Sequence, residues 1–337
     1  MSSPQFHPPR ALITGATGQD GAYLAELLLR EGWEVFGVTR PGGAGKAAEL
    51  RRWLERRGCR TDRFRILEAD LTKGEELRKI FDQACPEQVY HLAGPSRVNA
   101  SFESPQAVCD FICRAASVLL ETVRTRAPRA RFFFASSSEV FGVPPKAPQD
   151  ESVPFAPRSP YGCAKAFGTH LTRVFRESYG LFACSGILYN HESPRRSEQF
   201  VTQKICRAAA AIRLGLQTEL RLGNLDARRD WGHAADYVRA MRLMLQRAAP
   251  EDFVIAAGQS RRVRDVLEAA FSCVGLDWRP YVKQDPRLYR PSEPVELRGD
   301  AGKARRLLGW TPAISFEEMI REMTDAALGE LSEARLS

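Results

Sequence analysis

The sequence has no long apolar run and no clustered metal-binding residues. None of its hydrophobic stretches reaches the roughly 20 residues of a transmembrane helix, and Met1–Arg10 lacks the apolar centre of a signal peptide. The eight cysteines form no Cys-x-x-Cys motif, and the five histidines show no metal-ligand spacing. We therefore expect a protein of the reducing cytoplasm, with no membrane span, no disulfide framework and no bound metal.

The charge is basic but dispersed. The 337 residues carry a formal net charge of +8 at pH 7, with a pI near 9.2. Anionic small ligands account for this balance as well as nucleic acid does, and the basic residues are spread along the chain, so we predict no nucleic-acid partner. A chain of this length with 44% hydrophobic residues forms one large domain or two smaller ones.

The first 40 residues show the pattern that opens a dinucleotide-binding fold. Ala11–Thr14 is a short apolar strand, and a turn with glycines at 15, 18 and 21 leads into a helix and then a second strand at Glu34–Val38. Glycines let the backbone approach a pyrophosphate, and the helix N-terminus offers N–H groups to it. Between a strand and a helix this pattern indicates a cofactor site.

The end of the second strand favours NADP over NAD. It finishes in Thr39-Arg40, without the acidic residue that binds a ribose 2′-hydroxyl. An arginine there suits a 2′-phosphate. The alternative is that Arg40 is an ordinary exposed side chain.

Strands and helices continue to alternate, which predicts an α/β, Rossmann-type, doubly wound parallel sheet. The further strands are expected at Phe64–Leu67, Gln88–Leu92, Arg131–Ala135, Phe182–Leu188 and Phe253–Ile255. Ligands of such sheets bind beyond the carboxyl ends of the strands. The amino-acid composition changes after Asn190, where arginines and turn-forming residues are frequent. We therefore expect an NADP-binding domain over 1–190 and 231–258, a smaller α/β substrate domain over 191–230 and 259–328, and a frayed tail over 329–337.

The stretch from Ser136 to Lys165 carries groups for oxidising an alcohol. Strand alternation should point Ser137 and Glu139 the same way, and Ser159-Pro160 opens a helix on which Tyr161 and Lys165 share a face. A phenol has a pKa of about 10, and a nearby ammonium favours its phenolate form as a base. A serine can hold the substrate oxygen, and a carboxylate can take a proton from the carbon next to a new carbonyl. The alternative is that the tyrosine and lysine line a solvated helix face.

The chain resembles the extended short-chain dehydrogenase/reductases and, within them, the GDP-mannose 4,6-dehydratases. The resemblance runs from about Arg10 to Leu328, and the segments Asn190–Arg196 and Arg229–His233 separate this family from sugar-nucleotide epimerases. The other matching segments are Leu12–Gly21, Ser101–Pro105, Ser136–Glu139, Arg158–Gly162, Leu222–Asp226 and Asp285–Pro291.

The resemblance implies a lyase that converts GDP-mannose to GDP-4-keto-6-deoxy-mannose with retained NADP. Tyr161, Lys165 and Ser137 would oxidise C4, Glu139 would remove the C5 proton, water would leave from C6, and the hydride would return there. The family forms homodimers or homotetramers. The remaining alternatives are a sugar-nucleotide 4-reductase or epimerase, a GDP-heptose 4,6-dehydratase, and a non-catalytic NADP-binding protein.

The family's binding residues carry over by position. Cofactor contacts fall on Gly15, Ala16, Thr17, Gly18, Gln19, Asp20, Gly21, Arg40, Asp70, Leu71, Leu92, Ala93, Gly94, Ser96, Lys165, His191 and Arg196. Substrate contacts fall on Ser137, Glu139, Asn190, Lys204, Arg229, Arg290 and Glu293. For Arg195 and Arg196 the alternative is a structural ion pair.

The chain departs from the family at a few positions. Ser137 stands where threonine is usual, and Pro95, Arg97 and Ala107 replace the usual glutamine, aromatic or histidine, and tyrosine. The loop Pro41–Gly45 lacks the usual arginine- and serine-rich run. These departures bear on the nicotinamide side, on substrate identity and on tetramer assembly.

Overall fold

The computed structural model describes residues 7–289 and 296–336, which fall into two compact units. The first unit comprises 1–140, 159–187 and 238–253, and the second comprises 141–158, 188–237 and 254–337.

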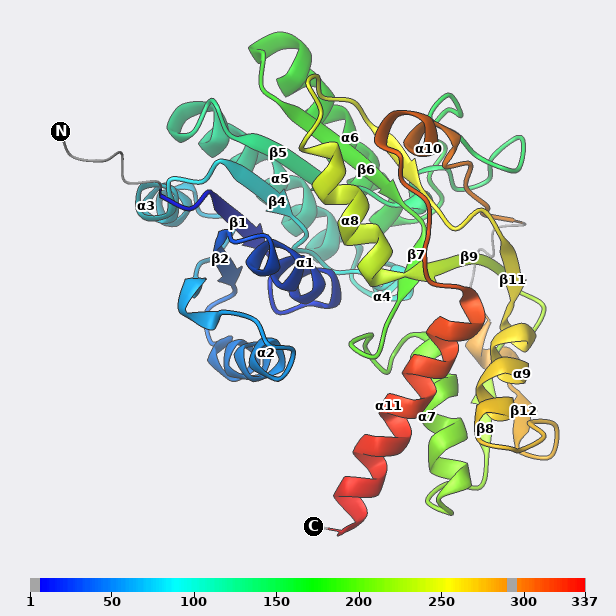
Figure 1. The fold of residues 1–337 in the computed structure, drawn as a ribbon. Coiled ribbons are helices and arrows are strands. Elements are labelled where there is room, and N and C mark those ends of the chain that lie inside the picture. The colour runs from blue at the N-terminus through cyan, green and yellow to red at the C-terminus, as the bar shows by residue number, and fades with distance from the viewer. Residues whose placement is uncertain (1–6, 290–295, 337) are drawn as a thin grey trace. The chain divides into compact units, whose positions relative to one another are not determined.

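The first unit is built on a sheet of seven strands in the order β10-β6-β5-β4-β1-β2-β3 (Figure 1). The strands are β1 (Arg10–Thr14), β2 (Glu34–Thr39), β3 (Phe64–Glu68), β4 (Gln88–His91), β5 (Arg131–Ala135), β6 (Ala183–Leu188) and β10 (Phe253–Ile255). The pairs from β3 through to β6 are parallel. The predicted Rossmann-type sheet is thereby confirmed. The strand order reverses between β1 and β4, which is the position where such sheets bind dinucleotides.

Helices cover both faces of this sheet, because its central strands are apolar on both sides. The helices are α1 (Gln19–Arg30), α2 (Ala44–Arg56), α3 (Gly74–Ala84), α4 (Val98–Glu103), α5 (Pro105–Arg126), α6 (Pro160–Tyr179) and α8 (Ala234–Met244), with the short 3-10 helices η1 (Thr61–Arg63) and η2 (Ser138–Val140). One core joins the sheet to α3, α5 and α6 through residues such as Leu77, Leu119 and Phe175. Figure 1 shows α1 on the opposite face.

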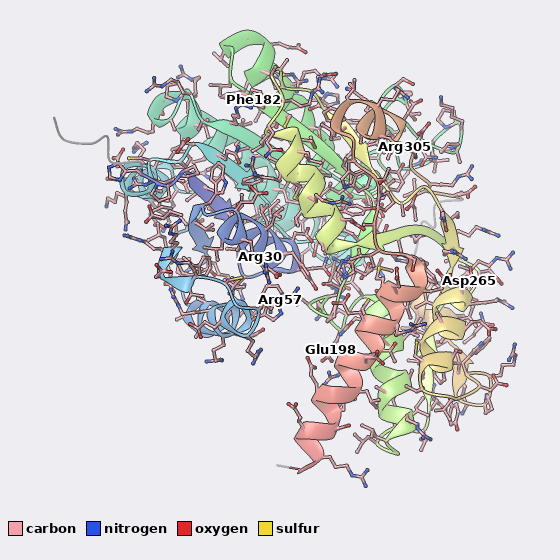
Figure 2. All side chains as sticks on the ribbon, in the orientation of Figure 1. Arg30, Arg57, Phe182, Glu198, Asp265 and Arg305 are labelled. Atoms are coloured by element: carbon pink, nitrogen blue, oxygen red, sulfur yellow. The ribbon has the colours of Figure 1, made fainter. Side chains whose placement is uncertain are left out.

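Charged side chains of the first unit pair locally. Arg30 and Arg57, labelled in Figure 2, lie 3.0 and 2.7 Å from the buried carboxylate of Glu26. The guanidinium of Arg57 also lies over the ring of Trp53, 4.7 Å from its centroid. These arginines hold α1 and the end of α2 together.

The second unit holds two small sheets and a helical layer. Its sheets have the orders β11-β9-β7 and β12-β8. The elements are β7 (Asn190–Glu192), β8 (Leu220–Leu222), β9 (Arg228–His233), β11 (Ser260–Arg262), β12 (Val282–Gln284), α7 (Val201–Arg213), α9 (Val263–Cys273), η3 (Pro286–Leu288), α10 (Gly302–Leu308) and α11 (Phe316–Leu336). A separate core packs α7, α9 and α11 around Trp231. The sequence analysis predicted none of these five short strands.

Two features set the extent of the second unit. The buried carboxylate of Asp230 accepts the amide N–H groups of Ala257, Gly258 and Gly299 at 2.9, 2.9 and 3.1 Å. The backbone N–H of Gln149 donates to Arg298 O at 2.8 Å, and residues 141–158 group with this unit, whereas the sequence placed them in the first domain. Residues after 328, expected as a tail, continue α11, which packs along α7.

Candidate active site

The N-terminus of α6 carries two of the predicted catalytic side chains. Ser159 caps the helix as predicted, because its Oγ accepts the Gly162 N–H at 3.0 Å. Proline occupies the first helical position, where its missing N–H costs nothing. Tyr161 and Lys165 follow one turn apart, and both are buried, with 8% and 6% of their surface exposed. The alternative of a solvated helix face is therefore wrong for this pair.

Lys165 ties α6 to the end of β5. Its Nζ donates to Ala135 O at 2.8 Å and lies 5.7 Å from the centroid of the Tyr161 ring. It also lies over the ring of Phe134, 5.2 Å from the centroid. Burial lowers the pKa of Lys165 to about 8, and the charge of Asp20 opposes part of that shift. The ammonium therefore loses its proton far more readily than an exposed lysine would.

Glu139 lies in the 3-10 helix η2 that follows β5, and Ser137 directly precedes that helix. The Val140 N–H donates to Ser137 O at 3.1 Å, and the Glu139 N–H donates to Ser137 Oγ at 3.3 Å. Strand alternation therefore does not apply here, and that part of the prediction is wrong: β5 ends at Ala135, and the chain coils at once. Both side chains are half-buried, and η2 packs against α6. The four predicted catalytic groups thus stand on two segments that are in contact.

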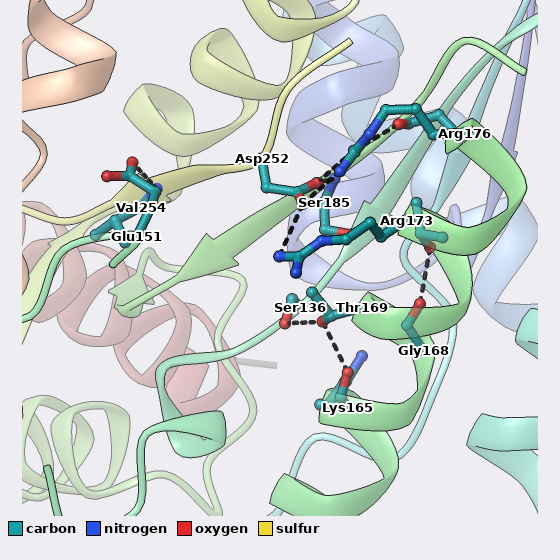
Figure 3. Close-up of polar contacts among 12 residues, drawn as sticks. Ser136, Glu151, Lys165, Gly168, Thr169, Arg173, Arg176, Ser185, Asp252 and Val254 are labelled. Carbon is teal, nitrogen blue, oxygen red and sulfur yellow. Dashed lines mark hydrogen bonds and ion pairs between the residues drawn. The ribbon is translucent and has the colours of Figure 1, made fainter. Parts of the chain in front are cut away.

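A buried hydroxyl chain braces α6 against the strand end, as Figure 3 shows. Thr169 Oγ1 donates its only hydrogen to Lys165 O at 2.8 Å. The 2.6 Å contact between Thr169 Oγ1 and Ser136 Oγ must therefore have Ser136 as its donor. Sequence reasoning did not single out Ser136 or Thr169, although Thr169 lies one turn after Lys165 on the same helix.

The glycine turn after β1 has no room for side chains. Gly15 has φ +73°, and a Cβ there would lie 2.9 Å from Ala93 Cα. A Cβ on Gly21 would lie 2.6 Å from Ala16 Cα. Gly18 is the N-cap of α1 and supplies no side-chain cap. Its first turn therefore presents backbone N–H groups of the kind that bind a pyrophosphate.

A buried polar pair joins the two strands at the reversal of strand order. Thr14 Oγ1 lies 2.8 Å from His91 Nδ1, and the Ala93 N–H donates to the same hydroxyl at 3.3 Å. Burial lowers the pKa of His91 to about 3, so the imidazole is neutral. This pair holds the segment Leu92–Ser96, predicted to contact the cofactor, against the glycine turn. Sequence reasoning missed it because the two residues are 77 positions apart.

The remaining cofactor predictions of the first unit lie at strand ends. Arg40 directly follows β2, is exposed, and forms no ion pair within the described ranges. Asp70 follows β3, and its carboxylate accepts the N–H and hydroxyl of Thr72 at 3.0 and 2.7 Å. These hydrogen bonds lower the pKa of Asp70. Leu71 is buried beside it.

The predicted residues of the second unit have structural partners. Asn190 begins β7 and pairs with Trp231 of β9. His191 Nδ1 donates to Tyr189 O at 2.7 Å, and its ring stacks on Tyr237. Lys204 Nζ donates to Arg221 O at 2.7 Å.

Two of the three arginines predicted as contacts in the second unit, Arg229 and Arg196, are held by the protein itself. Arg229 Nη1 donates to Arg228 O, and its side chain is buried. Arg196 forms an ion pair of 3.0 Å with the buried Glu192 and stacks on Phe200. The structural ion pair considered for Arg196 is therefore present, and its contact with a cofactor stays a prediction. Arg290 and Glu293 lie outside the described residues.

No group of three or more histidines, cysteines or acidic residues within the described ranges is placed to hold a metal ion. No described helix is long and apolar enough to cross a membrane.

Comparison with known proteins gives a consistent result. A family model described as GDP-mannose 4,6 dehydratase matches residues 12–323. GDP-mannose 4,6 dehydratase 2 of Arabidopsis thaliana is 46% identical over 94% of this chain and 86% of the plant protein. The GDP-mannose 4,6-dehydratase of Yersinia enterocolitica is 42% identical over 97% of this chain and 95% of the bacterial one.

Solved structures share the fold at lower identity. The dTDP-glucose 4,6-dehydratase DesIV of Streptomyces venezuelae, with NAD and TYD bound, has a TM-score of 0.83 at 22% identity and covers 96% of this chain and 98% of its own. RMD of Pseudomonas aeruginosa, complexed with NADPH, has a TM-score of 0.79 at 21% identity and covers 95% and 99%.

Proposed function

The chain belongs to the GDP-mannose 4,6-dehydratase family, and from this premise we propose how its residues convert GDP-mannose to GDP-4-keto-6-deoxy-mannose and water. The observation that carries the assignment of roles is the packing of η2, which holds Glu139 and directly follows Ser137, against the helix that carries Tyr161 and Lys165. A simple alcohol dehydrogenase needs the hydroxyl, phenol and ammonium but has no use for the carboxylate.

The cofactor is a nicotinamide dinucleotide, which the glycine turn fits because its backbone leaves no space for side chains at Gly15 and Gly21. When bound, it supplies reversible hydride transfer, so the overall reaction is redox-neutral. We propose NADP in particular, because Arg40 is exposed at the end of β2 and forms no ion pair in the described part of the chain. Replacing Arg40 with serine should weaken NADP binding more than NAD binding.

Side chains of this protein carry out the proton transfers of the reaction. Tyr161 takes the proton of the C4 hydroxyl, while the Ser137 hydroxyl holds that oxygen. The neighbouring Lys165 ammonium, 5.7 Å from the phenol ring centroid, stabilises the negative charge that develops there. Once C4 is a ketone, the C5 proton becomes acidic, and Glu139 removes it and protonates the leaving C6 hydroxyl.

The direct test is to incubate the purified protein with GDP-mannose, without added cofactor, and to follow the nucleotide sugar by mass spectrometry. We expect the loss of one water with no external NADPH consumed. Net NADPH consumption would instead identify a 4-reductase, and an unchanged mass with an altered sugar would identify an epimerase. If only a GDP-heptose loses water, the sugar assignment is wrong.

A glutamine variant tests the role of Glu139. Glu139→Gln should lower dehydration by about 100-fold or more, because the amide cannot take the C5 proton, while bound NADP is retained. Glu177→Gln, at an exposed position of α6, is the matched control and should keep full activity. An active Glu139→Gln enzyme would remove the base assignment.

The assembly and cellular setting follow from family membership and remain proposals. We propose a homodimer or homotetramer in the cytoplasm. Light scattering of the purified protein at several concentrations tests the assembly, and a concentration-independent monomer would exclude it.

A further inference from the structure

Two fully buried polar side chains of the second unit take no part in the proposed chemistry. Asp230, in β9, and Gln149 have none of their surface exposed. Burying a carboxylate or an amide costs free energy unless hydrogen bonds replace those to water. The partners of these two side chains therefore show what each of them holds in place. We call Asp230 and Gln149 the polar anchors.

Asp230 holds two distant segments against β9. One carboxylate oxygen accepts the N–H of Ala257 at 2.9 Å, and the other accepts those of Gly258 and Gly299 at 2.9 and 3.1 Å. Ala257 and Gly258 follow β10, whereas Gly299 lies far along the chain. A carboxylate suits this position because both of its oxygens are acceptors, while an asparagine would turn its NH₂ group toward at least one of these donors.

Gln149 binds the residue next to Gly299. Its Oε1 accepts the Tyr189 hydroxyl at 2.8 Å and the Arg298 N–H at 3.1 Å. Its backbone N–H also donates to Arg298 O at 2.8 Å. Because Arg298 directly precedes Gly299, Gln149 and Asp230 hold adjacent residues of one segment.

Each anchor acts next to a residue that is predicted to contact the substrate. Asp230 directly follows Arg229, whose backbone pairs with Leu297, just before the anchored segment. Successive side chains of a strand point to opposite faces, so Asp230 can fix the backbone of β9 from one face while Arg229 uses the other. The tyrosine that donates to the other anchor directly precedes Asn190. The anchors therefore fix the backbone at both predicted contacts.

We propose that Asp230 and Gln149 are positioning residues, which set Arg229 and Asn190 in place for the nucleoside diphosphate part of the substrate. This inference rests on the proposed function, because it takes those two residues as substrate contacts. The charge-assisted hydrogen bonds of an arginine depend on geometry, so a shift of its backbone weakens them. The anchors act through binding residues and not through a group that moves a proton, so their loss should raise KM and leave kcat nearly unchanged.

The test compares Asp230→Asn with a matched control, Asp236→Asn. Asp236 is also a buried carboxylate of the second unit, and one of its oxygens accepts the N–H groups of Ala313 and Ile314 at 2.9 and 3.0 Å. These donors lie ahead of α11 and outside the segments that the polar anchors hold. Both variants should unfold at a lower urea concentration than the wild type. Only Asp230→Asn should weaken GDP binding in calorimetry and raise the KM for GDP-mannose, each by about 10-fold.

A milder variant covers the case in which Asp230→Asn does not fold. Tyr189→Phe keeps the buried ring and removes only the hydroxyl that donates to Gln149. It should raise the Kd of GDP and the KM for GDP-mannose about threefold, as expected for one lost neutral hydrogen bond. Unchanged values in Tyr189→Phe would overturn the proposal.

The remaining outcomes separate this inference from the proposed function. A wild-type protein that binds no GDP would refute the proposed function and, with it, the substrate contacts on which the anchors act. GDP binding by the wild type, with equal affinity in Asp230→Asn, would overturn this inference alone. So would a loss of affinity in Asp236→Asn as large as that in Asp230→Asn, because affinity would then follow stability.

Discussion

Ser136 and Ser137 are neighbours in the chain, but their hydroxyls have different surroundings. Ser136 is buried and donates to Thr169, which in turn donates to Lys165 O. Ser137 is half-buried and directly precedes η2, which packs against α6. The Ser136 hydroxyl therefore helps to hold α6 against the end of β5, and the Ser137 hydroxyl is available to a substrate.

Alanine substitutions at these two serines should have opposite signatures. Ser137→Ala removes the hydrogen bond to the C4 oxygen and should lower kcat about 100-fold with little change in stability. Ser136→Ala removes a buried hydrogen bond and should lower the free energy of unfolding by about 1 kcal/mol with a smaller effect on kcat. Steady-state kinetics and urea unfolding measure both. If Ser136→Ala has the larger kinetic effect, the substrate role belongs to the wrong serine.

The buried Lys165 should make activity and stability respond to pH in opposite directions. Its pKa of about 8 lies below the unfolded value of about 10.4, so between these values the unfolded chain binds more protons than the folded one. The free energy of unfolding should therefore rise with pH in this window, by up to about 3 kcal/mol from this group. Catalysis should fall through the same window, since the ammonium that stabilises the phenolate is lost.

A lysine variant provides the control for that pH prediction. Lys165→Met has no titratable group, so its residual activity and its stability should lose both slopes. Profiles of kcat and of urea unfolding from pH 7 to 10 test this. A wild-type kcat that rises from pH 8 to 10 would contradict the assigned role of the ammonium.

At the scale of elements, the contact between β1, the glycine turn and α1 decides whether a dinucleotide fits. The turn is compact because the Gly18 N–H donates to Gly15 O at 3.0 Å and the Gly15 N–H donates to Val38 O at 3.1 Å. The backbones of three consecutive elements, β1, α1 and β2, therefore meet at this turn. A side chain added here would fill the space in which α1 packs against the turn.

Two glycine substitutions test this convergence. Gly21→Ala should abolish cofactor retention, because the new Cβ would lie 2.6 Å from the backbone of Ala16. Gly45→Ala, in α2 with nothing within 4 Å of the new methyl, should retain cofactor and gain about 0.5–1 kcal/mol of stability from helix propensity. Nucleotide released on denaturing each purified variant measures retention. Equal retention in the two variants would show that the turn tolerates a side chain.

Across the whole molecule, the sequence predicted the first unit well and the second poorly. Parallel strands buried on both faces appear in the sequence as apolar runs such as Phe132–Phe134, so these strands could be predicted. The cap Ser159-Pro160 is a local motif, so the start of α6 could be predicted as well. The strands β7 and β8 have three residues each and carry no such run. The bonds from Asp230 to Gly299 and from Thr14 to His91 join distant positions, so no local pattern indicates them.

The separate cores of the two units lead to a prediction about ligand-linked stability. NADP contacts are predicted mainly in the first unit, while those of GDP-mannose include Asn190, Lys204 and Arg229 of the second. A ligand at 100 times its Kd stabilises the unit that binds it by about 2.7 kcal/mol. In calorimetry of cofactor-free protein, NADP should raise the transition of the first unit, and GDP should raise that of the second. If NADP raises both, and His191→Ala or Arg196→Ala removes only the second shift, then the second unit also holds the cofactor. A protein whose transitions respond to neither ligand would contradict the proposed sites in both units.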